Sequence, residues 1–135
     1  MPKAMKIGYQ ALVEAARREI DEVTPEELRE LVEGGNVLIV DLRDIRELER
    51  DGLIPKAFHC PRGMLEFWID PASPYYRREF GEPKRFIFYC GLDWRSALAT
   101  QTAQRMGLEN VAHLKGGFKA WKDAGGEVEK LSKSS

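Results

Sequence analysis

The chain has no long apolar run and almost no net charge. Its longest apolar stretches are Val37–Val40 and Phe86–Cys90, far short of the roughly 20 residues that a membrane-spanning helix needs. The 21 Lys and Arg residues nearly balance the 22 Asp and Glu residues, which gives a net charge of −1. A chain without a general positive field holds neither nucleic acid nor an anionic lipid surface, so the sequence predicts no nucleic-acid partner and no membrane association.

Cysteine is also scarce, with Cys60 and Cys90 as the two thiols. Charged residues follow the first lysines within a few positions, so the N-terminus does not read as a secretory signal. We therefore expect a cytoplasmic protein with free thiols rather than a disulfide. His59 and His113 have no partners at the spacing of metal ligands, and the sequence predicts no metal site.

The length and composition are those of one ordinary domain: 135 residues, 43% hydrophobic and 32% charged. Apolar positions at helical spacing between Tyr9 and Ile20 predict an amphipathic helical extension over residues 1–20. Residues 127–135 are polar and predict a frayed C-terminal tail, which leaves residues 21–126 for the domain itself. The extension packs either on this domain or on a second copy, so a monomer and a weak homodimer both remain open.

Short apolar strands alternate with helical patterns along residues 21–126. Buried strands are predicted at Val37–Val40, Ala57–Cys60, Phe86–Tyr89 and Val111–Leu114. Helices are predicted between them, namely one that begins at Thr24-Pro25 and others at Asp44–Arg50, Gly63–Ile69 and Arg95–Met106. This alternation predicts an α/β domain with a doubly wound parallel sheet.

The segment Cys90–Ser96 leads from a predicted strand directly into a predicted helix, at the sheet edge where such folds bind ligands. The Cys90 thiol would then lie beneath backbone N–H groups at the positive end of the helix. That setting favours the thiolate, the form that attacks sulfur or phosphorus, and makes Cys90 the candidate nucleophile. Arg95 is expected either to fold over this loop or to brace it from behind.

The residues Cys90–Ser96 resemble the active-site loop of the rhodanese-like sulfurtransferases, in which a Cys, four residues and an Arg precede Ser or Thr. Asp41-Leu42-Arg43 is similar to that family's Asp-x-Arg after a strand, and Gly52–Ala57 is similar to its Gly-His-Ile-Pro-Gly-Ala segment. Leu114–Trp121 looks like its C-terminal signature. Pro61–Trp68 resembles a subgroup of single-domain bacterial members that carry an N-terminal helical extension.

This resemblance implies a rhodanese-like fold, a central five-stranded parallel sheet flanked by helices. It also implies a sulfurtransferase without metal or organic cofactor. A small-molecule donor such as thiosulfate would load Cys90 as a persulfide, and cyanide, a small thiol or a protein thiol would accept the sulfur. Cys90 and Arg95 would carry the chemistry. The other loop residues would bind substrate, namely Gly91, Leu92, Asp93, Trp94 and Ser96.

Residues outside the loop have weaker expectations. Arg62 follows a strand and is placed to bind an anionic donor, although a solvated arginine fits as well. Asp41 and Arg43 are expected to support the loop through hydrogen bonds rather than to react. Cys60 is more typical of a small buried residue than of a resolving thiol. The helical spacing near Met64 favours core positions for Phe67 and Trp68.

Asp93 stands where the family usually has Gly. It must therefore adopt a left-handed backbone or reshape the loop, and its carboxylate is expected to repel anionic donors. Two other functions stay open. One is a phosphatase or arsenate reductase, although related phosphatases place five residues between Cys and Arg. The other is a binding module without catalysis, because rhodanese folds also serve that role.

Overall fold

Five parallel strands form the centre of the molecule, as expected for apolar strands buried on both faces. The computed structural model describes residues 1–132. The strands pair in the order β1-β5-β4-β2-β3. Their bounds are β1 (Asp21–Val23), β2 (Val37–Asp41), β3 (Phe58–His59), β4 (Arg85–Tyr89) and β5 (Val111–Leu114). The rhodanese-like sheet implied by the resemblance is confirmed, including an edge strand, β1, that has one apolar residue and therefore no strand pattern of its own.

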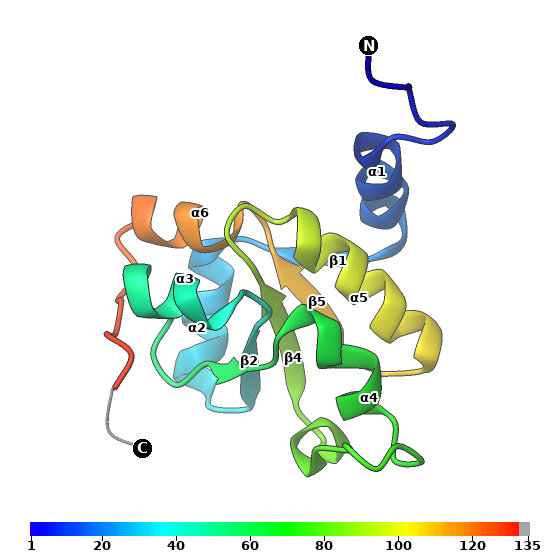
Figure 1. The fold of residues 1–135 in the computed structure, drawn as a ribbon. Helices are drawn as coiled ribbons and strands as arrows, with labels where there is room; N and C mark the ends of the chain where they lie inside the picture. Colours follow the sequence, from blue (N-terminus) through cyan, green and yellow to red (C-terminus); the bar gives the residue numbers. More distant parts are fainter. Residues whose placement is uncertain (133–135) are drawn as a thin grey trace.

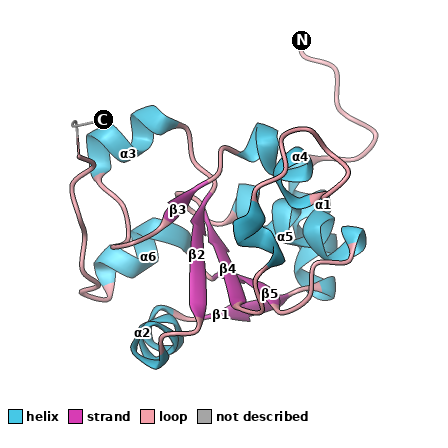
Figure 2. Cartoon of the chain, turned by 90° about the horizontal axis from the view of Figure 1, so that it is seen from below, coloured by secondary structure: helices cyan, strands magenta, loops and turns pink. Residues whose placement is uncertain are grey.

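Helices cover both faces of this sheet (Figures 1 and 2). Helices α2 and α6 lie on one face and helices α4 and α5 on the other, while α1 packs against α5. Their bounds are α1 (Tyr9–Glu19), α2 (Pro25–Gly34), α3 (Ile45–Asp51), α4 (Leu65–Ile69), α5 (Trp94–Met106) and α6 (Gly117–Asp123), with 3-10 turns η1 (Arg62–Met64) and η2 (Arg78–Gly81). Within the described residues, no helix has the length and apolar character that crossing a membrane requires.

Local sequence explains where two of these helices begin. Thr24 starts α2 with a capping box, in which its Oγ1 accepts the Glu27 N–H at 3.1 Å and its own N–H donates to Glu27 Oε1 at 3.0 Å. Asp44 starts α3 in the same way with Glu47. The capping box of α3 fixes Glu47 on the first turn, which becomes important for the site.

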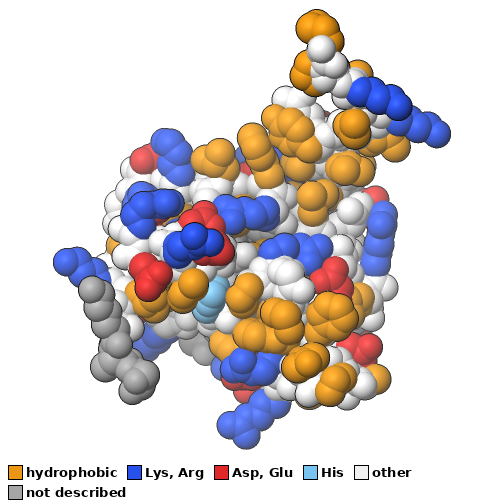
Figure 3. All heavy atoms as spheres, in the orientation of Figure 1, with side chains coloured by type: hydrophobic (Ala, Val, Ile, Leu, Met, Phe, Trp, Pro, Cys, Tyr) orange, Lys and Arg blue, Asp and Glu red, His pale blue; other side chains and the backbone are white. Residues whose placement is uncertain are grey.

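The N-terminal extension is a helix, as predicted, and it packs in cis on the domain. Val13 and Ala16 of α1 are buried against Ala97 of α5. The outer face of the extension keeps apolar side chains in solvent, and orange side chains gather over this part of the molecule in Figure 3. They include Met5, Ile7, Tyr9 and Leu12.

Two predictions outside the sheet are wrong, namely a core position for Phe67 and a frayed start of the C-terminal tail. Phe67 is 52% exposed, because Leu65 and Ile69, one turn apart on α4, face the core and leave Phe67 on the solvent side; Trp68 packs against the core as predicted.

The start of the tail is not frayed, because the Leu53 N–H donates to the Glu129 carbonyl and the Glu129 N–H donates back, both at 2.9 Å. The Trp121 indole N–H also donates to the carbonyl of Glu127, at 2.7 Å. The expected fraying of residues 133–135 lies outside the described residues.

A buried ion pair between Asp41 and Arg43 lies at the carboxyl end of β2. The Arg43 Nη2 lies 2.8 Å from Asp41 Oδ2, and both side chains are at most 1% exposed. The same Asp41 oxygen accepts the Tyr89 hydroxyl, and Arg43 also donates to the Gly52 carbonyl at 2.7 Å. Its guanidinium carbon lies 4.3 Å from the centre of the Phe118 ring. Strands β2 and β4, the turn after α3 and helix α6 therefore meet at one charged group.

We predict that Arg43→Met lowers the free energy of unfolding by about 3–5 kcal/mol, because it leaves the Asp41 carboxylate buried without its partner. Urea unfolding followed by circular dichroism measures this loss. Arg46→Met is the matched control, since the Arg46 side chain is 86% exposed, and its effect is expected to stay within about 0.5 kcal/mol. Equal losses in the two variants would contradict a central role for the buried pair.

Candidate active site

Cys90 is the first residue after β4 and lies at the base of the loop that leads into α5. The residue is 1% exposed. Its Sγ accepts the backbone N–H of Ser96, in the first turn of α5, at 3.4 Å. The thiol therefore lies at the positive end of a 13-residue helix, where backbone dipoles favour a negative charge.

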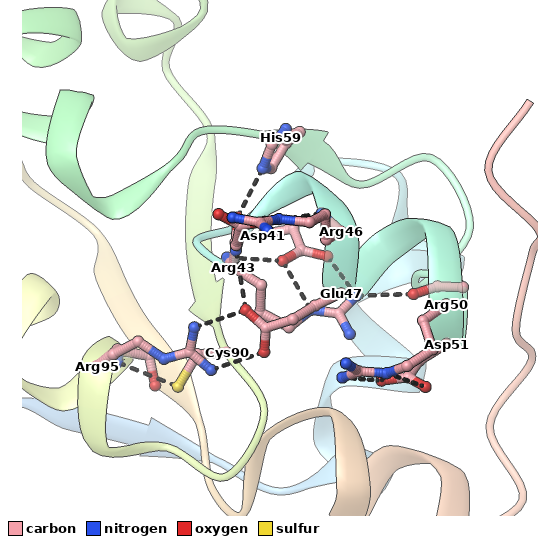
Figure 4. Close-up of polar contacts among 12 residues, drawn as sticks. Asp41, Arg43, Arg46, Glu47, Arg50, Asp51, His59, Cys90 and Arg95 are labelled. Atoms are coloured by element: carbon pink, nitrogen blue, oxygen red, sulfur yellow. Dashed lines mark hydrogen bonds and ion pairs between the residues drawn. The ribbon is translucent and has the colours of Figure 1, made fainter. Parts of the chain in front are cut away.

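Arg95 lies beside the thiol, and its guanidinium is held from the opposite side by Glu47 (Figure 4). The Arg95 Nη1 and Nη2 atoms donate to the two carboxylate oxygens of Glu47 at 2.8 and 3.0 Å. This two-pronged pair raises the pKa of Arg95, and Cys90 adds to that effect. The same contact lowers the pKa of Glu47. The guanidinium lies between the Cys90 loop and Glu47 of α3, so neither of the two expected roles, folding over the loop or bracing it from behind, describes its position fully.

Sequence reasoning missed Glu47. Its position on α3 follows from the capping box with Asp44, but Glu47 and Arg95 are separated by 48 positions. Only the pairing of β2 with β4 brings the start of α3 next to the start of α5. The three-residue spacing between Asp44 and Glu47 can be read from the sequence, whereas the ion pair between Glu47 and Arg95 cannot.

The start of α6 supports the loop from behind. The Phe118 N–H donates to the Cys90 carbonyl at 2.8 Å, and the Lys119 N–H donates to the Gly91 carbonyl at 3.1 Å. Gly117 has φ +65°, and a Cβ at this position would lie 2.7 Å from both of those carbonyl oxygens. The Leu114–Trp121 signature therefore acts as a backbone support for the Cys90 loop.

Asp93 has a positive φ of 148°, the kind of backbone conformation expected where the family usually has Gly. Its side chain is 7% exposed. One carboxylate oxygen accepts the Gly116 N–H at 2.8 Å, and the other is paired with the guanidinium of Arg17 in α1. The sequence predicted that the Asp93 carboxylate repels anionic donors. In the structure Arg17 pairs with this carboxylate, so its negative charge is compensated.

Ser96 connects the loop to a buried histidine. Its hydroxyl donates to the Asp93 carbonyl at 3.2 Å and lies 2.8 Å from His113 Nδ1. His113 Nε2 lies 2.7 Å from a carboxylate oxygen of Glu22 in β1. Burial lowers the pKa of His113 although Glu22 acts in the opposite direction. This chain of polar contacts fixes the first turn of α5 against β5 and β1.

Two further loop residues are exposed. The side chains of Leu92 and Trp94 stand in solvent, with residue exposures of 49% and 47%. The Trp94 ring lies 5.0 Å from the ring of Tyr9, at the start of α1. The loop thus exposes two apolar side chains, while Cys90 itself is buried.

The other predicted site residues lie apart from the thiol. The Arg62 guanidinium pairs with Glu66 one helical turn later, at 2.9 Å, instead of turning to the loop. Cys60 is fully buried, and burial raises its pKa to about 12, so its thiol stays protonated. Asp41 and Arg43 contact each other at the end of β2 as described above. Within residues 1–132, no group of three or more His, Cys, Asp and Glu side chains is placed to hold a metal ion.

Residues 24–124 match the family described as "Rhodanese-like domain". The chain belongs to this family. A structure from Rhodopseudomonas palustris, described as a protein of unknown function and "Possible Tyrosine Phosphatase", has 52% sequence identity and a TM-score of 0.91 to this rhodanese-like domain. The similarity covers 96% of this chain and 99% of that one.

Sulfurtransferases are among its curated relatives. The human protein named "Thiosulfate:glutathione sulfurtransferase" is 30% identical over 70% of this chain and 87% of its own length. The mouse "Thiosulfate sulfurtransferase/rhodanese-like domain-containing protein 3" is 27% identical over 73% of this chain. The matched segment spans 66% of the length of the mouse protein.

We predict that Gly117→Ala destabilises the rhodanese-like domain more than Gly125→Ala. Both glycines have positive φ, but a Cβ at Gly125 meets nothing within 4 Å. Gly125→Ala is expected to cost about 1–2 kcal/mol for the backbone conformation alone. Gly117→Ala adds about 1–3 kcal/mol for pressing on the Cys90 loop.

Thermal unfolding of both variants measures this difference. The rate at which iodoacetamide alkylates Cys90 reports the loop directly, and we expect it to change in Gly117→Ala and to stay at the wild-type value in Gly125→Ala. Indistinguishable variants would show that α6 does not set the loop's shape.

Proposed function

We propose that this rhodanese-like domain is a sulfurtransferase that carries sulfane sulfur as a persulfide on Cys90. The observation that supports this most is the position of the Cys90 sulfur, at the base of a helix-capping loop and 3.4 Å from the Ser96 backbone nitrogen. Backbone N–H groups at a helix start stabilise a thiolate and equally the terminal sulfur of a persulfide. The names of the human and mouse relatives favour the same chemistry.

In the first half-reaction, the Cys90 thiolate attacks the outer sulfur of thiosulfate. A sulfur–sulfur bond forms to Cys90 while the bond within thiosulfate breaks, and sulfite leaves with the electron pair. In the second, cyanide or a thiolate attacks the terminal sulfur of the persulfide. Thiocyanate or a new persulfide leaves, and the Cys90 thiolate returns. Each displacement moves neutral sulfur between two anions, so no outside oxidant, metal or organic cofactor is needed.

The loop residues would have different parts in this cycle. Arg95 holds positive charge next to the sulfur, and Glu47 fixes the direction of its guanidinium. Gly91, Leu92, Asp93, Trp94 and Ser96 would surround the donor. Asp41 and Arg43 would keep the end of β2 in place beneath the loop, while Arg62 would meet a donor only after leaving Glu66. Two free thiols fit a reducing compartment such as the cytoplasm.

A phosphatase is the second candidate, because the similar structure from Rhodopseudomonas palustris carries that description. Phosphoryl transfer at such a loop needs an Arg whose two prongs are free to hold phosphate oxygens. Here two of the five N–H groups of Arg95 already donate to Glu47, so fewer donors are left for phosphate oxygens. Four residues between Cys90 and Arg95 also make a smaller loop than a tetrahedral oxyanion requires. These features favour transfer of a single sulfur atom.

We predict that thiosulfate adds one sulfur, about 32 Da, to the intact protein and that cyanide removes it. Intact-mass spectrometry measures both steps. Cys90→Ala is expected to gain no mass, because the nucleophile is absent. Cys60→Ala is the matched control and is expected to behave like the wild type, since that thiol is buried and protonated.

The same preparation separates the alternatives. Hydrolysis of p-nitrophenyl phosphate that depends on Cys90, without any gain of sulfur, would establish the phosphatase instead. A folded protein that takes sulfur neither from thiosulfate nor from glutathione persulfide would be a binding module. Either result would overturn the sulfurtransferase proposal.

A further inference from the structure

A buried carboxylate within a loop that must receive anions is an unusual choice of residue. Asp93 lies three positions after Cys90, and its side chain is 7% exposed. A negative charge at this place opposes both a thiolate on Cys90 and an approaching anion. Burial also makes an unpaired carboxylate costly. Asp93 therefore needs a compensating positive charge.

Arg17 of α1 supplies that charge. Its Nη2 donates to Asp93 Oδ1, and the contact joins residues that are 76 positions apart. The Gly116 N–H donates to the other Asp93 oxygen. The Arg17 Nε is buried and has no hydrogen-bond partner within residues 1–132, and the Glu22 carboxylate oxygen lies 4.0 Å away. The guanidinium therefore points toward Asp93, although this orientation leaves one of its N–H groups without an acceptor.

The rest of α1 holds Arg17 in this position. At one end of the helix, the Tyr9 ring contacts Trp94, a residue of the loop. At the other end, Gln104 of α5 donates to the Glu19 carbonyl at 2.7 Å. Between them, Val13 and Ala16 pack on α5. Helix α1 thus contacts α5 from Trp94 at its start to Gln104 in its last turn, which fixes the Arg17 guanidinium next to Asp93.

Two other charges near this pair have contacts of their own, although Glu22 also lies 4.0 Å from the Arg17 Nε. Glu22 contacts His113, and Arg95 is bound by Glu47. Removing Arg17 would therefore leave the Gly116 N–H as the one hydrogen-bond donor to the Asp93 carboxylate within the described residues. The local charge at the loop would change by one unit.

We infer that Arg17 is a positioning residue of the Cys90 loop: it neutralises Asp93 and thereby lets a loop with a carboxylate in place of glycine accept an anionic donor. The helical extension is then part of the site and not an independent appendage. This inference rests on the proposed function, because the binding of an anionic donor matters to a sulfurtransferase. The charge at the Cys90 loop can nevertheless be measured without sulfur transfer.

Two alkylating agents of nearly equal size measure this charge. Iodoacetate is an anion and iodoacetamide is neutral, and both react with the thiolate. The ratio of their rate constants at Cys90, followed by peptide mass spectrometry, cancels differences in thiolate content and in folded fraction. We expect Arg17→Met to lower the iodoacetate-to-iodoacetamide ratio at least about threefold, since it leaves Asp93 uncompensated.

Matched variants test the mechanism. Arg18→Met removes a neighbouring charge that is exposed on the same helix, and its ratio is expected to equal that of the wild type. Asp93→Asn keeps a side chain that tolerates positive φ and removes the negative charge. The double variant Arg17→Met/Asp93→Asn is therefore expected to regain the wild-type ratio. An unchanged ratio in Arg17→Met, or no recovery in the double variant, would overturn the inference.

Kinetics then connects the charge to the donor. For Arg17→Met we expect the KM for thiosulfate to rise at least about threefold while kcat changes less, because the anion is repelled before it reacts. A fall in kcat alone would point to a general loss of loop structure and contradict a charge effect. If the wild type accepts no sulfur at all, the alkylation ratios still decide whether Arg17 sets the charge of the loop.

Discussion

The buried pair of Asp41 and Arg43 is the contact on which the surroundings of the site depend. Asp41 ends β2 and also accepts the hydroxyl of Tyr89, the residue immediately before Cys90. Arg43 reaches the turn after α3 and lies over the Phe118 ring of α6. Phe118 in turn donates its N–H to the Cys90 carbonyl. Two charges that cannot be separated without a large desolvation penalty thus connect the strand before Cys90 to the helix behind it.

The loop itself is held mainly from outside. Its backbone is supported by α6, its arginine by α3 and its aspartate by α1, so three elements distant in sequence define one seven-residue turn. Each arginine in these contacts has a carboxylate partner: Arg95 with Glu47, Arg43 with Asp41, and Arg17 with Asp93. In the proposed sulfurtransferase, the backbone N–H groups of the loop and the balance of charge among these pairs would attract an anionic donor.

Local patterns in the sequence predict most of the strands and helices, and they indicate Cys90 as the candidate nucleophile. The strands at Val37 and Phe86 were visible as apolar runs, and Cys90 was singled out because a strand led directly into a helix. Two features stayed hidden. Strand β1 has one apolar residue and pairs only because β5 lies beside it, and Glu47 and Arg17 reach the loop across 48 and 76 positions. Side-chain pairing between distant segments depends on the assembled sheet, which a single sequence does not display.

The central claim, that Cys90 carries sulfur within this loop, is tested most directly by a crystal structure of the protein after treatment with thiosulfate. The account predicts an additional sulfur atom bonded to Cys90 Sγ and surrounded by the backbone N–H groups of the loop, with the Arg95 to Glu47 pair intact. An unmodified Cys90 in crystals of protein whose mass has increased by one sulfur, with the new atom on Cys60 instead, would contradict it.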